Sequence, residues 1–154
     1  MGVGVAVSVA VGVAVSVGVA GGQEWGMRVF GHGVDIIEVA RVGRMRAEHG
    51  GRFLERVFTA RELEDCAEDS RLDQRLAARF AAKEAALKAL GTGLSCGITW
   101  QDVAVHTQAS GRPELVISGR AGEIARERGI AGWSVSISHT KVVSVASVLA
   151  FGGE

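Results

Sequence analysis

Two acidic residues stand where a metal ion could bind. Asp35 follows a valine-rich segment interrupted by Gly31 and Gly33, where the backbone can approach a ligand closely. Glu84 lies in segment 72–90, on the apolar side of an expected helix. If these carboxylates converge, they form a hard oxygen site suited to Mg²⁺, which usually takes one or two protein carboxylates with water and phosphate. The alternative is that Asp35 caps a helix and Glu84 pairs with a lysine one turn later.

Basic residues accompany Glu84 along the same segment. Lys88 follows one turn later and could hold a phosphate bound to the same metal. Lys83 lies within the apolar arc, where we expect an ion pair; a base with a pKa lowered by burial is the alternative. Three arginines recur every four residues and so share one side: Arg71, Arg75 and Arg79. They would either clamp phosphates bidentately or form a solvated basic face paired with acids.

Composition excludes several classes of protein. The 154 residues are enough for one ordinary domain, and the formal net charge of zero gives no electrostatic case for binding nucleic acid or an anionic membrane. Cys66 and Cys96 form no CxxC pair, which argues against a structural zinc site or a disulfide scaffold. Two reduced thiols in a cytoplasmic protein is the expected state.

Residues 1–26 differ from the rest of the chain. Valine occupies every odd position from Val3 to Val19, and an eight-residue pattern is almost repeated. We interpret this segment as a low-complexity extension outside the fold, with Met27 as the start of the domain 27–154. A membrane anchor or signal segment and a functional strand are the alternatives.

From Met27 onward, helices and strands are mixed. The first half is predicted to contain a strand ending near Asp35, then a helix with Val39, Val42 and Met45, and then a short helix from the capping box Thr59–Glu62 to about Asp69. A long helix, Leu72–Leu90, follows and ends at Gly91. The second half is predicted to contain strands 102–107 and 114–118, a helix 119–128, and strands 133–140 and 142–150. Because most strand connections read as hairpins, we expect an α+β fold with a largely antiparallel sheet packed against one long helix and shorter helices.

Three motifs together resemble the holo-acyl-carrier-protein synthase group of 4′-phosphopantetheinyl transferases. They are "GHGVDIIEVARV", "RFAAKEAALKALGTGL" and "GRP" followed by "VSISHT". The resemblance runs from Met27 to about Leu149 in the family's order and spacing, and the middle motif is the most specific. It implies the fold of that family for the domain 27–154.

The resemblance also implies a role for each candidate residue. Asp35 and Glu84 would be the Mg²⁺ ligands, and Lys88 would hold the phosphate under attack, which makes these three the expected catalytic residues. The implied contacts to coenzyme A are Arg71, Arg79, Gly111, Arg112, Pro113, His139 and Thr140. Arg71 matches the family pattern least well. From spacing alone, a lone histidine such as His139 at a strand end is more often a turn residue than a catalyst.

The implied reaction is transfer of 4′-phosphopantetheine from coenzyme A to a serine of apo-acyl carrier protein, with release of adenosine 3′,5′-bisphosphate. The resemblance further implies Mg²⁺ dependence, a role in fatty acid biosynthesis, a cytoplasmic homotrimer, and neither nucleic acid nor membrane as partner. The rival interpretation is a non-catalytic module of the same fold that binds a nucleotide or a carrier protein. The proton acceptor stays open between Glu84 and a metal-bound water ordered by Asp35.

Overall fold

The computed structural model describes residues 14–18, 24–66 and 70–153. The elements, in chain order, are β1 (Ala14–Gly18), β2 (Glu24–Glu38), α1 (Val39–Val57), α2 (Ala60–Cys66), α3 (Leu72–Leu90), the 3₁₀ helix η1 (Trp100–Asp102), β3 (Val103–Thr107), β4 (Pro113–Ile117), α4 (Gly119–Glu127), β5 (Gly132–His139) and β6 (Val143–Gly153). The long helix and its cap at Gly91, which is in the left-handed region at φ 79°, are as predicted.

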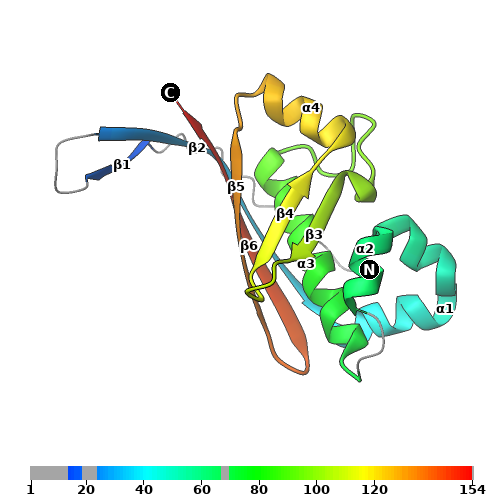
Figure 1. The fold of residues 1–154 in the computed structure, drawn as a ribbon. Helices are drawn as coiled ribbons and strands as arrows, with labels where there is room; N and C mark the ends of the chain where they lie inside the picture. Colours follow the sequence, from blue (N-terminus) through cyan, green and yellow to red (C-terminus); the bar gives the residue numbers. More distant parts are fainter. Residues whose placement is uncertain (1–13, 19–23, 67–69, 154) are drawn as a thin grey trace.

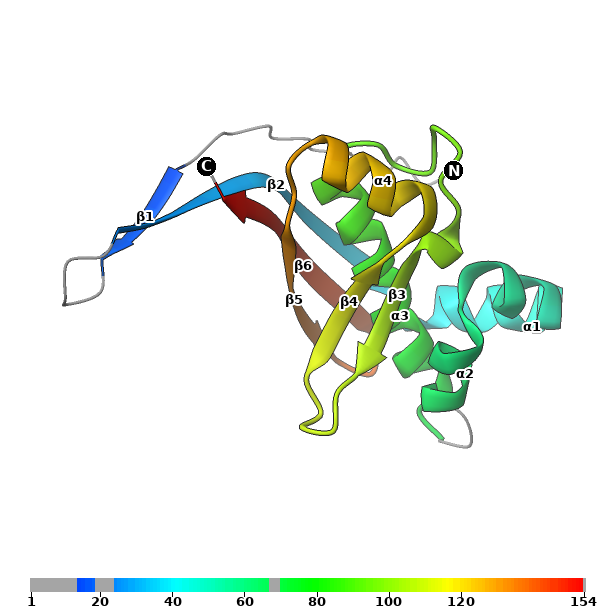
Figure 2. The same cartoon turned by 45° about the horizontal axis from the view of Figure 1, so that its top comes forward.

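Two antiparallel sheets flank the long helix. One has the strand order β1-β2-β6-β5 and the other is the hairpin β3-β4. Helix α3 packs across β2 and β6 and also contacts β3, while α1 and α2 lie together at one end of the molecule (Figure 1). Turning the molecule shows β3 and β4 on the side of α3 away from β2 and β6 (Figure 2). The predicted α+β fold with a largely antiparallel sheet is confirmed.

Two glycines in β2 allow α3 to lie directly on the strand. A Cβ atom at Gly31 would stand 1.9 Å from the Ala89 carbonyl oxygen, and one at Gly33 would stand 1.9 Å from that of Ala85. Any side chain at these positions would therefore push the helix away from the sheet. The expectation that the strand ends near Asp35 is wrong, since β2 continues to Glu38 and pairs with β6 along that length.

Helix α3 is buried on most of its surface. Its buried residues include six alanines, whose small side chains let neighbouring elements approach from several directions. The least buried line runs through Phe80, Glu84 and Lys88, all of intermediate exposure. The prediction that Lys83 and Glu84 lie on the apolar side of the helix is confirmed for Lys83, which is fully buried, while Glu84 is of intermediate exposure. A single apolar side could not be defined from the sequence, because a helix packed on several sides has no single hydrophobic stripe.

Helix α2 begins with the predicted capping box. The Thr59 backbone N–H donates to Glu62 Oε2 over 2.8 Å, and the Glu62 N–H donates to Thr59 Oγ1 over 3.3 Å. The helix is described to Cys66, and the predicted end near Asp69 lies outside the described residues. The ion pair expected for Lys83 is confirmed, since its Nζ lies 2.8 Å from Glu62 Oε2 with both side chains fully buried.

β1 and the first residues of β2 extend beyond the body of the fold. Among the described residues, β1 pairs with residues 24–28 at the start of β2, and this end of the ladder points away from the helices (Figure 1). The proposed boundary between residues 26 and 27 falls within β2, and much of segment 1–26 lies outside the described residues. That this segment is dispensable stays a prediction.

Candidate functional site

The first part of the site is an acid–lysine cluster of Asp35, Glu84 and Lys88. Asp35 comes from β2, while the other two lie one turn apart on α3, which the glycines of β2 bring close. Lys88 Nζ lies 2.9 Å from Asp35 Oδ1 and donates to the Val34 carbonyl over 3.0 Å. Lys88 therefore pairs with the acid of the strand rather than with Glu84 on its own helix.

The two carboxylates of this cluster repel each other. Burial raises the pKa of Glu84 above its ordinary value of 4.5, and the negative charge of Asp35 raises it further. Lys88 and Arg41 act in the opposite direction on the same pKa. An additional cation at this place would relieve the repulsion.

The donor set fits Mg²⁺ better than a metal that needs many protein ligands. Among the described residues, no group of three or more His, Cys, Asp or Glu side chains could hold a metal ion. Two carboxylates beside a lysine match a hard cation that keeps its remaining positions for water and substrate phosphate. Asp35 and Glu84 are the residues that would hold it.

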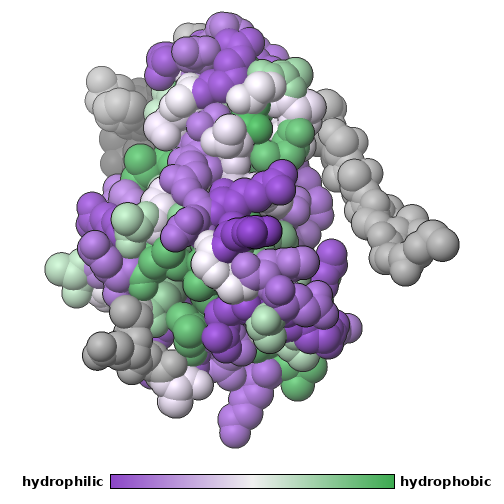
Figure 3. Space-filling view, turned by 90° about the vertical axis from the view of Figure 1, so that its right-hand side faces the viewer, coloured by the Kyte–Doolittle hydropathy of each residue, from purple (hydrophilic) through white to green (hydrophobic). Residues whose placement is uncertain are grey.

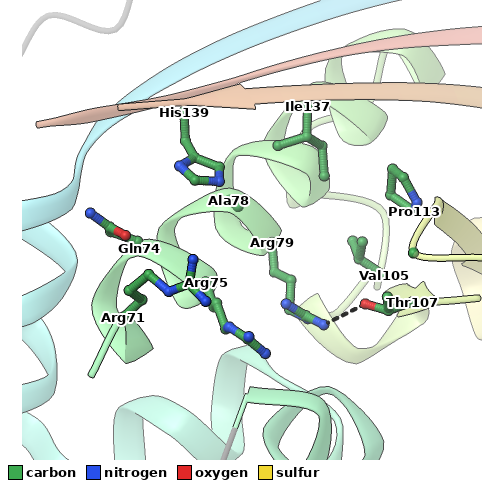
Figure 4. Close-up of a pocket in the computed structure, with 11 residues that line it drawn as sticks. Arg71, Gln74, Arg75, Ala78, Arg79, Val105, Thr107, Pro113, Ile137 and His139 are labelled. Carbon is green, nitrogen blue, oxygen red and sulfur yellow. Dashed lines mark hydrogen bonds between the residues drawn. The ribbon is translucent and has the colours of Figure 1, made fainter. Parts of the chain in front are cut away.

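The second part of the site is a pocket of about 380 Å³, here called the arginine pocket. Its lining residues are Arg71, Gln74, Arg75, Ala78, Arg79, Val105, Thr107, Gly111, Pro113, Ile137 and His139. Arg71, which precedes α3, lines one side together with Arg75 and Arg79 of α3. The hairpin β3-β4 lines another side, and the end of β5 supplies His139 (Figure 4). The four-residue repeat of arginines thus shares one side, as predicted.

Arg79 is the most enclosed cation of the pocket. Its side chain is 8% exposed, and one terminal N–H donates to Thr107 Oγ1 over 3.0 Å (Figure 4). Asp65 Oδ2 lies 3.6 Å from the same guanidinium. The buried Nε–H has no hydrogen-bond partner among the described residues. A guanidinium fixed at the wall of the pocket beside two other arginines favours an anionic ligand.

The structure brings together five of the seven residues predicted to contact coenzyme A, and the other two lie outside the pocket. Arg112 lines a separate groove between β4 and β5. Thr140 uses its hydroxyl in the turn after β5, where Oγ1 accepts the N–H groups of Val142 and Val143 over 3.1 Å each.

Other lining residues were missed in the sequence. Val105 lies in the predicted strand 102–107 and Ile137 within the motif VSISHT, where an apolar residue predicts only a position in the sheet. Thr107 and Gln74 belong to no motif. The end of a predicted strand next to a Gly- and Pro-containing hairpin was the available signal for Thr107. Nothing in the spacing singled out Gln74.

The cluster and the pocket share one face of the sheet. Asp35 pairs with Ala146 of β6, and Ala146 pairs with Ile137 of β5. Directly paired residues point to the same face, so Asp35 and Ile137 lie two strands apart, about 10 Å, on the side that faces α3. The arginine pocket and the acid–lysine cluster therefore adjoin the same helix and the same face of the sheet.

Comparison with known proteins places this arrangement in a family. The model of the 4′-phosphopantetheinyl transferase superfamily matches residues 31–141, which include every predicted site residue. The chain belongs to this superfamily. A holo-[acyl-carrier-protein] synthase from Geotalea daltonii is 43% identical over 121 residues, covering 79% of this chain and 97% of that protein. The corresponding protein of Geobacter sulfurreducens is 44% identical, with 79% and 96% covered.

Solved structures of the family share the fold. The holo-[acyl-carrier-protein] synthase of Neisseria meningitidis aligns with a TM-score of 0.72 at 33% identity, over 79% of this chain and 98% of that one. The Bacillus anthracis enzyme, solved in complex with CoA (3′,5′-ADP), aligns with a TM-score of 0.67 at 34% identity, over 81% and 98%. These relatives confirm the predicted family and fold.

The surface adds two observations. The side of the molecule that carries α1 and α2 is mainly hydrophilic, with smaller apolar patches between polar side chains (Figure 3). Within the described ranges, no helix is both long and apolar enough to cross a membrane.

Proposed function

We propose that this chain is a holo-[acyl-carrier-protein] synthase that transfers 4′-phosphopantetheine from coenzyme A to a serine of apo-acyl carrier protein, releasing adenosine 3′,5′-bisphosphate. The observation that carries this proposal is the pairing of an anion pocket with a two-carboxylate cluster on the same face of the sheet. Family membership and relatives of this name over most of the chain support it.

The residues divide the task of holding coenzyme A. Arg79 and Arg71, which both line the arginine pocket, would bind phosphates of the coenzyme. Lys88, held by Asp35, would place its ammonium beside the pyrophosphate. Asp35 and Glu84 would hold Mg²⁺, which when bound neutralises charge on the pyrophosphate and the departing bisphosphate. In this reaction, positioning and neutralisation of charge contribute more than covalent help from the protein.

The serine of the carrier protein must lose a proton as its oxygen attacks phosphorus. Glu84 is one candidate acceptor because burial raises the pKa of its carboxylate, although a cation held by the same carboxylate would lower that pKa. A water molecule ordered by Asp35 is the alternative acceptor. The P–O bond to the bisphosphate breaks as the bond to the serine oxygen forms, so no oxidant or other co-reactant is needed.

We further propose a homotrimer in the cytoplasm that serves fatty acid biosynthesis. The sheet face opposite α3 supports association of like chains, since Val34 and Ile36 of β2 and Leu149 of β6 are 48%, 65% and 39% exposed there. Apolar side chains gathered on an uncovered sheet face are typical of a surface that another chain covers.

One assay tests the transfer. Purified protein is mixed with coenzyme A and apo-acyl carrier protein, with Mg²⁺ or with a chelator, and the carrier is weighed by mass spectrometry. We expect a gain of one phosphopantetheine group on the carrier only when Mg²⁺ is present. Binding of coenzyme A without any gain in mass would favour the non-catalytic module instead.

A further inference from the structure

Two acids of α2 form a second layer behind the arginine pocket. Glu62 and Asp65 are three residues apart, and so share one side of the helix. Each accepts a backbone N–H from β3: Val105 donates to Glu62 Oε1 over 2.8 Å, and Thr107 donates to Asp65 Oδ2 over 3.4 Å. β4 pairs along the other edge of β3, so these acids accept backbone N–H groups on the edge of β3 that does not pair with β4.

The same two acids also face two cations of α3. Glu62 pairs with Lys83 at 2.8 Å, fully buried, and Lys83 donates further to the backbone carbonyls of Trp100 and Val103. Asp65 faces Arg79 at 3.6 Å at the wall of the pocket. Helix α2 is thus tied to both α3 and β3, two of the elements that line the pocket.

Asp65 contacts two of the pocket's arginines. Its carboxylate faces the Arg79 guanidinium, and its backbone carbonyl accepts an N–H of Arg75 over 3.1 Å. The carboxylate also accepts the Thr107 N–H, while the Thr107 hydroxyl accepts from Arg79. Arg79 is therefore held by α2 and β3 at the wall of the arginine pocket.

We propose that Asp65 is a positioning residue, which aims Arg79 at the phosphates of the coenzyme, while the Glu62–Lys83 pair fixes α2 against α3. The proposal rests on the proposed function for the identity of the ligand. An arginine side chain loses much conformational freedom when it is fixed, and paying that cost before binding increases affinity.

The direction in which removal of the Asp65 carboxylate changes phosphate affinity distinguishes a positioning role from a simple effect of charge. Asp65 is an anion close to an anion pocket, so if it acted only through its charge, removing it would tighten phosphate binding. If it positions Arg79, removing it weakens binding. A merely structural role would lower stability without depending on Arg79.

The experiment is a double-mutant cycle on ligand affinity. Asp65→Ala, Arg79→Ala and the double variant are titrated with adenosine 3′,5′-bisphosphate by calorimetry, alongside wild type. We expect Asp65→Ala to raise Kd about tenfold and to raise KM for coenzyme A similarly, with kcat within about twofold. In the Arg79→Ala background the same change should alter Kd by less than about twofold, because no guanidinium is left to aim.

The chain offers a matched control variant and a second pair of variants that test how Arg79 is held. Glu64→Gln removes a negative charge from an exposed position of the same helix and should leave Kd unchanged. Asp65→Asn, which keeps an acceptor oxygen, should weaken binding less than Asp65→Ala. If Asp65→Ala does not fold, Thr107→Val removes the other acceptor for Arg79 and should couple with Arg79→Ala in the same way, while Thr107→Ser restores affinity.

The outcomes are separable. Unchanged or tighter binding by Asp65→Ala, or an equal effect with and without Arg79, overturns the positioning role. Wild-type protein that binds the bisphosphate but modifies no carrier overturns the proposed function, while the affinity cycle still tests Asp65 by itself.

Discussion

At the scale of single residues, Asp35 and Glu84 should be required for activity but not for folding. Asp35→Asn and Glu84→Gln keep side-chain shape and lose the charge needed to hold Mg²⁺, so each should lower transfer about a hundredfold or more. Thermal unfolding of Glu84→Gln should occur at the same temperature as wild type or higher, because the change removes a desolvated carboxylate that Asp35 repels. Near-normal turnover at modest Mg²⁺ would show that the altered residue does not bind the metal.

The burial of Cys66 predicts how the stability of the protein depends on pH. Burial raises the pKa of this fully buried thiol above its ordinary value of 9.0, although Arg79 and Arg75 act in the opposite direction. A raised pKa in the folded state means that the unfolded chain loses the proton first, so stability is present below about pH 9 and declines as pH rises further.

We expect the free energy of unfolding to fall from about pH 8 to pH 10 by about 1 kcal/mol more in wild type than in Cys66→Ala. Urea denaturation at each pH measures this, and Cys96→Ala, which changes an exposed thiol, should follow wild type. Parallel pH dependence in wild type and Cys66→Ala would contradict the assignment.

At the scale of elements, the contact of β2 with α3 depends on glycine. In Gly33→Ala the new Cβ would meet the Ala85 carbonyl at 1.9 Å, and neither backbone can move without opening the acid–lysine cluster. We expect a loss of about 3 kcal/mol or more in stability, measured by denaturant unfolding. The matched control is Gly51→Ala within α1, whose Cβ would meet only the end of the Glu55 side chain at 3.8 Å, and which should be neutral or stabilising. Similar effects at both positions would mean that close packing does not set the requirement.

At the scale of the whole molecule, the uncovered sheet face should control assembly. Ile36→Lys places a charge where we propose that another chain packs, and should shift the trimer to monomer in light scattering coupled to size-exclusion chromatography. Val116→Lys, on the separate hairpin and 38% exposed, is the control that should leave assembly unchanged. A wild-type monomer, or a trimer that tolerates Ile36→Lys, would rule out this surface.

The N-terminal extension should be dispensable. The ladder between β2 and β6 begins at Met27 opposite Gly153, so deleting residues 1–26 removes none of those pairs. We expect transfer and thermal stability equal to or better than those of the full chain, since the valine-rich repeat favours aggregation. An insoluble or inactive product would show that the segment belongs to the domain.

The sequence by itself determined what depends on neighbours along the chain. The limits of α3, its glycine cap, the capping box at Thr59 and the paired hairpin strands follow from spacings of a few residues, and the structure confirms them. The three motifs also predicted the family. Each of these signals is local, because a cap or a turn is decided by residues within one or two turns of each other.

Only the tertiary structure decided which distant groups meet. Lys88 pairs with Asp35, 53 positions away, and not with Glu84 one turn before it; Lys83 finds its partner in Glu62. Asp65 belonged to no motif, yet it reaches both Arg79 and β3. Such partners depend on the order of strands in the sheet and on how closely α3 lies on β2. Gly31 and Gly33 set that distance, and the sequence did not show this because the requirement for glycine arises from contact with α3.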